Sequence, residues 1–139
     1  MRLVVDTSAI VAALAEADYT RYLLPLQNAA QVSMSAVNVY ESRLILTGRR
    51  DGRPRFDPAL IGKFEQLLTI LSVQIVPFDA EQAMLAHAAY LRWGKGFHPA
   101  ALNMADCAAY ALSRLRREPL LFKGENFAAT DVELALDTS

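Results

Sequence analysis

The chain has 139 residues, and its 14 Lys and Arg against 15 Asp and Glu give a formal net charge of −1. This length and a hydrophobic fraction of 53% indicate one folded domain over residues 1–139 and exclude a disordered chain, while the charge excludes nucleic-acid binding by bulk attraction alone. The single cysteine excludes an internal disulfide and favours a cytoplasmic location, and no apolar run approaches the roughly 20 residues that a membrane span needs.

The N-terminal segment predicts one strand and two helices. Residues 3–5 are apolar and rich in β-branched side chains, which predicts a buried parallel strand that ends at Asp6. A helix is expected over residues 9–15, where small and apolar residues predominate. A second helix is expected to start at Asp18, and Pro25 should kink or interrupt it.

The next segment predicts a second strand and a third helix. Residues 31–34 alternate polar and apolar side chains, which is typical of a short strand. Ser35 is then a suitable N-cap for a helix over residues 36–46, and Gly48 ends that helix. Residues 49–55 are polar and rich in arginine, which predicts an exposed turn.

Two further helices flank a third predicted strand. Asp57, followed directly by a proline, favours a helix start at that point. Residues 73–76 predict the strand, which a proline ends. Asp79 caps the next helix, with Gln82 in the capping-box position, and the pattern of small and apolar residues runs to Trp93.

The C-terminal segment predicts one long helix between short strands. The helix covers residues 102–115, a fourth strand covers 119–122, and a last edge strand covers 132–136, with a turn at 123–126 between the two strands. Apolar strands that alternate with amphipathic helices predict the α/β class, with a parallel sheet covered by helices on both faces.

Several common catalytic motifs are absent from the sequence. The chain has no G-x-G-x-x-G, no G-x-x-x-x-G-K-[ST], no H-E-x-x-H and no G-x-S-x-G. Dinucleotide, P-loop, zincin and α/β-hydrolase functions therefore lose their usual support. The carboxylates are the remaining groups that can carry chemistry.

Three acids stand out because their neighbours in the sequence are apolar or small. Asp6 ends the first strand, Glu41 lies on a largely apolar helical face, and Asp106 lies near the start of an apolar helix. In parallel sheets, sites form beyond the carboxyl ends of the strands. Acids on core-facing elements need a partner, and carboxylate oxygens suit Mg²⁺ or Mn²⁺. Together the three acids favour a metal site.

Each acid also has a purely structural interpretation. Asp6 can cap the following helix, and Asp106 can be stabilised by the dipole of its own helix without a metal. Glu41 can pair with Arg43 on the surface. In the same way His98 can contact a phosphate or pack locally as an ordinary loop histidine.

A run of arginines forms a local basic segment that only one aspartate balances. Its members are Arg49, Arg50, Arg53 and Arg55, with Asp51 among them. Such a run is usually a solvated turn, but it can also steer an anionic partner. Four side chains are therefore candidate contacts to a phosphate: Arg49, Arg50, Arg53 and His98.

Four blocks of sequence follow one another over most of the chain. They are Val4–Ala9, Asn38–Glu41, His98–Leu112 and Leu121–Asp131. In order and separation they resemble the PIN domain and, more narrowly, the VapC toxins of bacterial type II toxin–antitoxin systems. The first block alone is a weak signal, whereas the arrangement of all four is specific.

The resemblance implies a three-layer α/β/α fold and a Mg²⁺-dependent endoribonuclease in which Mn²⁺ can substitute. By position, Asp6, Glu41 and Asp106 match the family's three most dependable acids, which hold the metal and are catalytic. Where the family commonly has a fourth acid, this chain has Asn126. The candidates for that fourth position are Asn126, Glu125 and Asp131. Outer groups orient metal ligands, and the plausible ones here are Thr7, Ser8 and Asn103.

The resemblance also implies partners for the chain. An RNA is the substrate, a small VapB-type antitoxin holds the toxin inactive, and the toxin is usually a homodimer. Surfaces covered by partners are compatible with the mean hydropathy of +0.17, although a small α/β core would give a similar value.

Two other functions remain open. A metal-dependent phosphatase of the haloacid-dehalogenase type needs a second aspartate two residues after Asp6, and Ser8 occupies that place. A non-catalytic RNA-binding or receiver-like module would use the acids only to cap helices.

Overall fold

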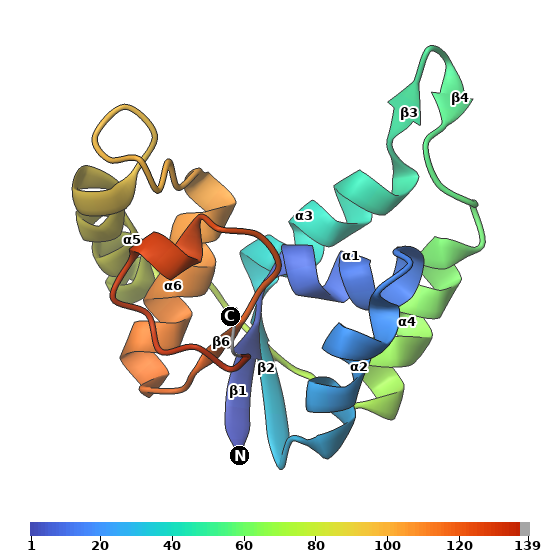
Figure 1. Ribbon diagram of the computed structural model, residues 1–139, viewed down its shortest axis with the longest axis horizontal. Helices are drawn as coiled ribbons and strands as arrows, with labels where there is room; N and C mark the ends of the chain where they lie inside the picture. The colour runs from blue at the N-terminus through green and yellow to red at the C-terminus, as the bar shows by residue number, and fades with distance from the viewer. Residues whose placement is uncertain (137–139) are drawn as a thin grey trace.

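A short parallel sheet occupies the centre of the molecule. The computed structural model describes residues 1–136, and Figure 1 shows the sheet between two groups of helices. The strands lie parallel in the order β5-β2-β1-β6. Their bounds are Arg2–Val5 for β1, Gln31–Ser35 for β2, Gln74–Val76 for β5 and Leu120–Leu121 for β6. The predicted α/β class with a parallel central sheet is confirmed.

Helices cover both faces of the sheet. The bounds are Thr7–Ala15 for α1, Tyr19–Asn28 for α2, Ala36–Thr47 for α3, Leu60–Ile70 for α4, Ala80–Trp93 for α5 and Met104–Arg116 for α6. Helices α5 and α6 pack on one side and α1, α2 and α4 on the other, while α3 contacts α1, α4 and α6 (Figure 1). Within residues 1–136, no helix is both long and apolar enough to cross a membrane.

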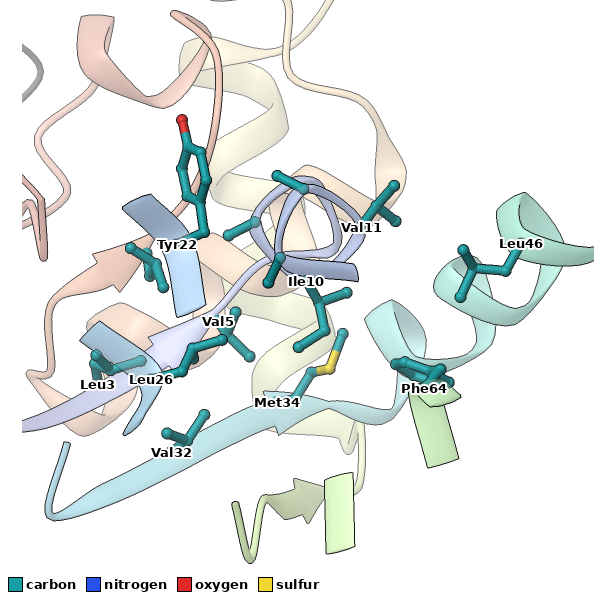
Figure 2. Packing of buried hydrophobic residues seen from close by; sticks show 14 of the residues in the cluster. Leu3, Val5, Ile10, Val11, Tyr22, Leu26, Val32, Met34, Leu46 and Phe64 are labelled. Atoms are coloured by element: carbon teal, nitrogen blue, oxygen red, sulfur yellow. The ribbon is translucent and has the colours of Figure 1, made fainter. Parts of the chain in front are cut away.

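Strand β1 is buried on both of its faces. Leu3 and Val5 point into a cluster that includes Ile10 of α1 and Phe64 of α4 (Figure 2). Val4 points the other way, into a cluster formed mainly by α5 and α6. Because successive side chains of a strand point to opposite faces, a fully apolar strand needs helices on both sides. The apolar run at residues 3–5 therefore predicted the layering correctly.

Most of the predicted elements are confirmed. Strands lie at four of the five places where the sequence predicted them. Ser35 caps α3 by accepting a hydrogen bond from the Val37 amide at 3.2 Å, and Gly48 is the C-cap of the same helix. The C-terminal helix predicted over residues 102–115 begins slightly later, at Met104.

Helix α2 continues through Pro25, which lies inside it. Because proline removes a backbone donor and its ring crowds the preceding turn, we expected a kink or an interruption. The helix is not interrupted. Tyr22 and Leu26, on either side of the proline, are buried in the core, so tertiary packing stabilises the helix at this point.

Two helix starts differ in detail from the prediction. Asp57 accepts a hydrogen bond at 2.9 Å from the backbone amide two residues later, which forms a turn, and α4 begins only at Leu60. Asp79 caps α5 as predicted, through the Gln82 amide at 2.9 Å. The Gln82 side chain does not complete a capping box, because its Nε2 donates to the Pro77 carbonyl at 2.9 Å and it is buried.

Residues 49–55 form more than the exposed turn that we predicted. Strands β3, Arg49–Arg50, and β4, Arg53–Pro54, pair antiparallel. Asp51 and Gly52 connect them with φ angles of 52° and 76°, as in the two-residue turns that suit the twist of a hairpin. This arginine hairpin, residues 49–55, projects from the end of α3 away from the sheet (Figure 1).

The edge strand predicted over residues 132–136 is not found in the part of the chain that the structure describes. An isolated bridge joins Leu134 to Leu120. Its backbone hydrogen bonds run from Leu120 to Glu133 at 2.8 Å and from Ala135 to Leu120 at 3.1 Å. Because β6 is only two residues long, it offers too short an edge for a longer ladder.

Candidate functional site

The three acids singled out in the sequence line one cavity of about 380 Å³. Asp6 directly follows β1, Glu41 lies on α3 and Asp106 lies in the first turn of α6. The cavity is lined by Asp6, Thr7, Ser8, Val11, Glu16, Glu41, Ile45, Asp106 and Lys123. We call it the acid cavity. Its place beyond the end of a parallel strand is the one expected from the sheet topology.

Asp6 combines a structural and a chemical role. Its Oδ2 accepts hydrogen bonds from the Ser8 amide at 3.0 Å and from the Ser8 hydroxyl at 2.6 Å, which caps α1. The residue is only 2% exposed, and within the described chain its Oδ1 is buried without a hydrogen-bond partner. An unpaired buried carboxylate oxygen is costly unless a cation or a proton satisfies it.

The electrostatics of the acid cavity favour a bound cation. Burial raises the pKa of Asp6 to about 7 against the opposing hydrogen bonds of Ser8, and the carboxylates of Asp106 and Glu41 add to the rise. Burial also raises the pKa of Asp106, against the opposing hydrogen bond from the Asn103 amide, and Glu41 again adds to it. Negative charge therefore accumulates here at a cost that a divalent ion would relieve.

Asp106 is fixed by a capping box at the start of α6. Its Oδ2 accepts from the Asn103 amide at 2.9 Å, and the Asn103 side chain accepts from the Asp106 amide at 2.8 Å. These two hydrogen bonds hold the Asp106 carboxylate at the start of α6. The dipole of α6 also stabilises a negative charge at this position.

Asn38 joins the three elements that carry the acids. Its carbonyl accepts a hydrogen bond from the Thr7 hydroxyl of α1 at 3.2 Å. Its side-chain Nδ2 donates to the Ala105 carbonyl of α6 at 3.1 Å. Asn38 itself is a fully buried residue of α3. Sequence reasoning missed this role, although a polar residue three positions before Glu41 on a helix was a usable signal.

Ser8 links the acid cavity to the loop after β6. Its hydroxyl, which donates to Asp6, accepts a hydrogen bond from the Lys123 amide at 3.0 Å. The Lys123 ammonium in turn pairs with Glu16 at 2.6 Å and with Asp18 at 3.0 Å. Sequence reasoning missed Lys123 and Glu16 as cavity residues, since their contacts cross more than a hundred positions of the chain.

None of the three candidates for a fourth acidic position lines the acid cavity. Asn126 is exposed at the start of a short 3-10 helix, Phe127–Ala129. Glu125 borders a neighbouring cavity. Asp131 accepts a hydrogen bond from the Tyr110 hydroxyl at 2.5 Å and pairs with Arg92 at 3.4 Å, which ties the C-terminal segment to α5 and α6.

The candidate phosphate contacts lie in two different places. Arg49, Arg50 and Arg53 are exposed on the arginine hairpin, outside the acid cavity. The ring of His98 packs edge-on against Trp93 with centroids 4.9 Å apart, and its Nδ1 accepts from the Ala100 amide at 3.0 Å. The hairpin thus presents its charges to solvent, whereas His98 has local partners.

The side chains of the acid cavity fit a hard divalent ion. They offer carboxylate and hydroxyl oxygens, and the unpaired Oδ1 of Asp6 faces no competing donor. As arranged in residues 1–136, no group of three His, Cys, Asp or Glu side chains converges closely enough to hold a metal ion. Like-charged carboxylates repel one another when no cation lies between them, so binding would draw these acids together.

The comparisons of this chain with known proteins agree with one another. A profile described as the PIN domain matches residues 3–133. The protein named "Ribonuclease VapC28" from Mycobacterium tuberculosis is 41% identical over 137 residues, which covers 97% of this chain and 98% of the relative.

Two solved structures share the fold. One is a toxin-antitoxin complex from Klebsiella pneumoniae, with a TM-score of 0.65, 16% identity and coverage of 98% of this chain and 96% of that chain. The other is VapC20 of M. tuberculosis, named as a Sarcin-Ricin loop cleaving toxin, with a TM-score of 0.67, 20% identity and coverage of 95% and 98%.

Proposed function

The chain belongs to the PIN-domain family, and we propose that it is a VapC toxin, a metal-dependent endoribonuclease of a type II toxin–antitoxin system. The observation that carries the proposal is the acid cavity, in which Asp6, Glu41 and Asp106 meet beyond the end of β1. The ribonuclease name of a relative that is 41% identical over almost the full chain supports it.

Asp6, Glu41 and Asp106 would hold Mg²⁺, for which Mn²⁺ can substitute. A divalent ion bound there would supply a water of lowered pKa and would offset negative charge on the scissile phosphate. The chain's own residues orient the acids: Ser8 occupies Oδ2 of Asp6 and leaves Oδ1 for the ion, while Asn103 holds Asp106 in place. The protein contributes fixed geometry and charge, and no covalent nucleophile is needed.

The arginine hairpin is proposed to bind the RNA backbone outside the acid cavity. Arg50 and Arg53 are paired across the hairpin. With Arg55 they contribute to the lining of a hollow that has a volume of about 480 Å³. Guanidinium groups bind phosphates in bidentate geometry. His98 stays a candidate phosphate contact through Nε2, the ring nitrogen other than the one that accepts from the Ala100 amide.

A VapB-type antitoxin and a second copy of the chain are the proposed protein partners. The fold shared with the toxin-antitoxin complex from K. pneumoniae supports the first. Large apolar side chains that are more than half exposed support covered surfaces: Met84, Leu91, Phe97 and Met104. The cytoplasmic location expected from the single cysteine stays a prediction.

Two alternative functions agree less well with the contacts in the structure than the toxin function does. In a phosphatase of the haloacid-dehalogenase type, the position of Ser8 would hold an acid, but here its hydroxyl is tied to Asp6 and to the Lys123 amide. A module that used the acids only as caps would account for Asp6 and Asp106 through their capping bonds. It would give no reason for the unpaired Oδ1 of Asp6 or for Glu41 beside it.

Cleavage of RNA by the purified protein tests the proposal. With Mg²⁺ and without an antitoxin, the parent chain is expected to cut RNA internally, and Asp106→Asn is expected to be at least about 100-fold slower. Glu65→Gln is the matched control, because Glu65 is an exposed acid on α4 that pairs with Arg43 and does not line the acid cavity. Equal rates for Asp106→Asn and the parent chain would refute the role of the acid cavity.

The proposed homodimer has its own test. Light scattering at micromolar concentration is expected to give at least twice the 15.3 kDa mass of one chain. The apolar exposure of Met84 and Met104 supplies the driving force, since burying such side chains on association releases water from them. A monomeric mass at that concentration would contradict the expectation.

A further inference from the structure

Lys123 stands where the acid cavity meets a second cavity. The second one has a volume of about 240 Å³ and is lined in part by Arg21, Tyr22, Lys123, Gly124 and Glu125. Lys123 belongs to the linings of both. A polymer that passes from one cavity into the other would therefore cross the Lys123 side chain.

The backbone of Lys123 is held at a fixed place relative to Asp6. Its amide donates to the Ser8 hydroxyl at 3.0 Å, and that hydroxyl donates to Asp6 Oδ2 at 2.6 Å. The Ser8 side chain thus connects the Lys123 backbone to the Asp6 carboxylate. Any group that binds at Lys123 is held in register with the carboxylate proposed to bind the metal.

Two acids also hold the ammonium group in place. Nζ lies 2.6 Å from Glu16 Oε2 and 3.0 Å from Asp18 Oδ1, and it sits 5.8 Å from the centre of the Tyr22 ring. An ammonium has three N–H donors. Glu16 Oε2 and both carboxylate oxygens of Asp18, at 3.0 and 3.1 Å, match these three donors, so a phosphate oxygen would replace one of the two Asp18 contacts of this side chain, which is 36% exposed.

These ion pairs need an explanation other than stability. All three side chains are more than one third exposed, and exposed ion pairs contribute little to folding. A lysine is costly to immobilise because its side chain has many rotamers. A lysine that is already oriented, by contrast, is useful for binding because that entropy has been lost before the ligand arrives.

The charge distribution indicates what the ligand is. The acid cavity by itself repels a polyanion, and one divalent ion offsets only part of the charge of the four acids that line it, of which Glu16 is already paired with Lys123. Phosphates that flank the scissile one still need cations of their own. Arg21 and Lys123 place two basic side chains along the second cavity against one acid, Glu125, and Lys123 also lines the acid cavity.

We propose that Lys123 and Arg21 bind a phosphate next to the scissile one, in the second cavity, and so set the register of the RNA strand over the acid cavity. This subsite rests on the proposed ribonuclease function. Glu16 and Asp18 act as positioning residues for the Lys123 ammonium. The ligand is the backbone of single-stranded RNA, which the subsite contacts without reading its bases.

The test measures RNA binding apart from cleavage. The probe is a fluorescein-labelled RNA of 12 nucleotides with random sequence, in EDTA, and anisotropy gives the dissociation constant over a range of salt concentrations. Lys123→Gln is expected to bind about fivefold more weakly at 100 mM salt, with the slope of log K against log salt shallower by about 0.7. Arg21→Gln is expected to behave in the same way.

Two further variants and a stability measurement serve as controls for this test. Lys123→Arg retains the charge and should restore the salt slope. Lys63→Gln is the matched control, because Lys63 is an exposed lysine on α4 away from both cavities, and it should bind as the parent chain does. Thermal unfolding of each variant shows whether a loss of binding is a loss of fold.

The outcomes separate this subsite from the proposed function. If Lys123→Gln and Arg21→Gln bind with the affinity and salt slope of the parent chain, the subsite is refuted, whether or not the parent cleaves RNA. If they lose binding as expected but the parent chain fails to cleave with Mg²⁺, the subsite stands and the nuclease does not. A parent chain that shows no salt-dependent RNA binding overturns both.

Discussion

Helix α3 joins the acid cavity to the arginine hairpin, yet the two regions differ in burial and in the range of the contacts that form them. The cavity brings together acids from three elements, and Asp6 at its base is 2% exposed. The hairpin is local, its residues are nearly all exposed, and its strands pair only with each other. The cavity depends on the whole fold for its geometry, whereas the hairpin depends on a two-residue turn.

This difference separates chemistry from recognition. A site that must hold like charges together is destabilising and needs a rigid surround, which the core supplies. A surface that must meet phosphates needs only charge and access, and can change without disturbing the core. Variation among related toxins in the RNA they cleave is therefore expected to lie in the hairpin and not in the cavity.

The largest expected effect tests whether the cavity really costs stability. Because burial raises the pKa of Asp6 to about 7 from 3.8, its protonated form is favoured in the folded state. Its contribution to stability is present below pH 4 and is lost as the pH rises towards 7. In EDTA, the free energy of unfolding should fall by up to about 1.4 kcal/mol per pH unit over that range, relative to Asp6→Asn.

Urea unfolding of both proteins from pH 4 to 8 measures this difference. The comparison with Asp6→Asn removes the contribution of other acids, such as Asp18, whose pKa is lowered by Lys123 and which acts in the opposite sense. Identical pH dependence in the two proteins would show that the buried carboxylate carries no cost. Addition of Mn²⁺ at pH 7 should stabilise the parent chain and have less effect on Asp6→Asn.

A smaller effect is expected when the hairpin loses charge. Arg50→Gln with Arg53→Gln should weaken RNA binding by about tenfold or more at 100 mM salt and make the salt slope shallower by about 1.4, with kcat unchanged. The turnover number is preserved because these side chains lie outside the acid cavity. Steady-state cleavage kinetics at several salt concentrations separate the two parameters.

Arg2→Gln serves as the control for the hairpin variant. Arg2 is exposed at the start of β1, far along the strand from Asp6. Its loss removes one positive charge without touching either region. A fall in kcat of the hairpin variant would contradict the separation of RNA binding from catalysis. An equal loss of RNA binding in Arg2→Gln would contradict a specific role of the hairpin.

The smallest effect is expected at the edge of the acid cavity. Asn126 is exposed and does not line the cavity, so Asn126→Asp should preserve the affinity for Mn²⁺, with a change of less than about twofold, because an exposed charge is screened. Calorimetric titration with Mn²⁺ measures it. A tenfold gain would place position 126 among the metal ligands, and a clear loss would equally contradict the expected screening.

Much of the fold was predictable because its signals are local. Residues 3–5 are apolar without alternation, which requires cover on both faces, and Ser35 and Asp79 cap their helices as their positions suggested. The hairpin was missed although Asp51-Gly52 is a favourable turn pair, because the flanking arginines lack the alternation of a strand. A strand made only of exposed residues leaves no hydrophobic pattern.

The acid cavity was predictable in part, for a related reason. Asp6 follows a strand, and sheet topology tells where such an acid lies, whereas Glu41 and Asp106 were grouped with it because their neighbours in the sequence are apolar or small, and the resemblance then matched all three to the family's acids. The contact of Lys123 with Glu16 is a tertiary one that no local pattern encodes. Asp131 was a plausible fourth acid by distance in sequence, yet its hydrogen bond to Tyr110 lies elsewhere in the fold.

The hydrogen bonds of Asn38 have a mechanical consequence. Asn38 on α3 hydrogen-bonds to Thr7 at the start of α1 and to Ala105 at the start of α6. It therefore holds together the three elements that carry the acids. The separation of the carboxylates then depends on the hydrogen bonds of this one buried residue. A substitution of Asn38 is therefore expected to weaken metal binding and RNA cleavage before it unfolds the protein.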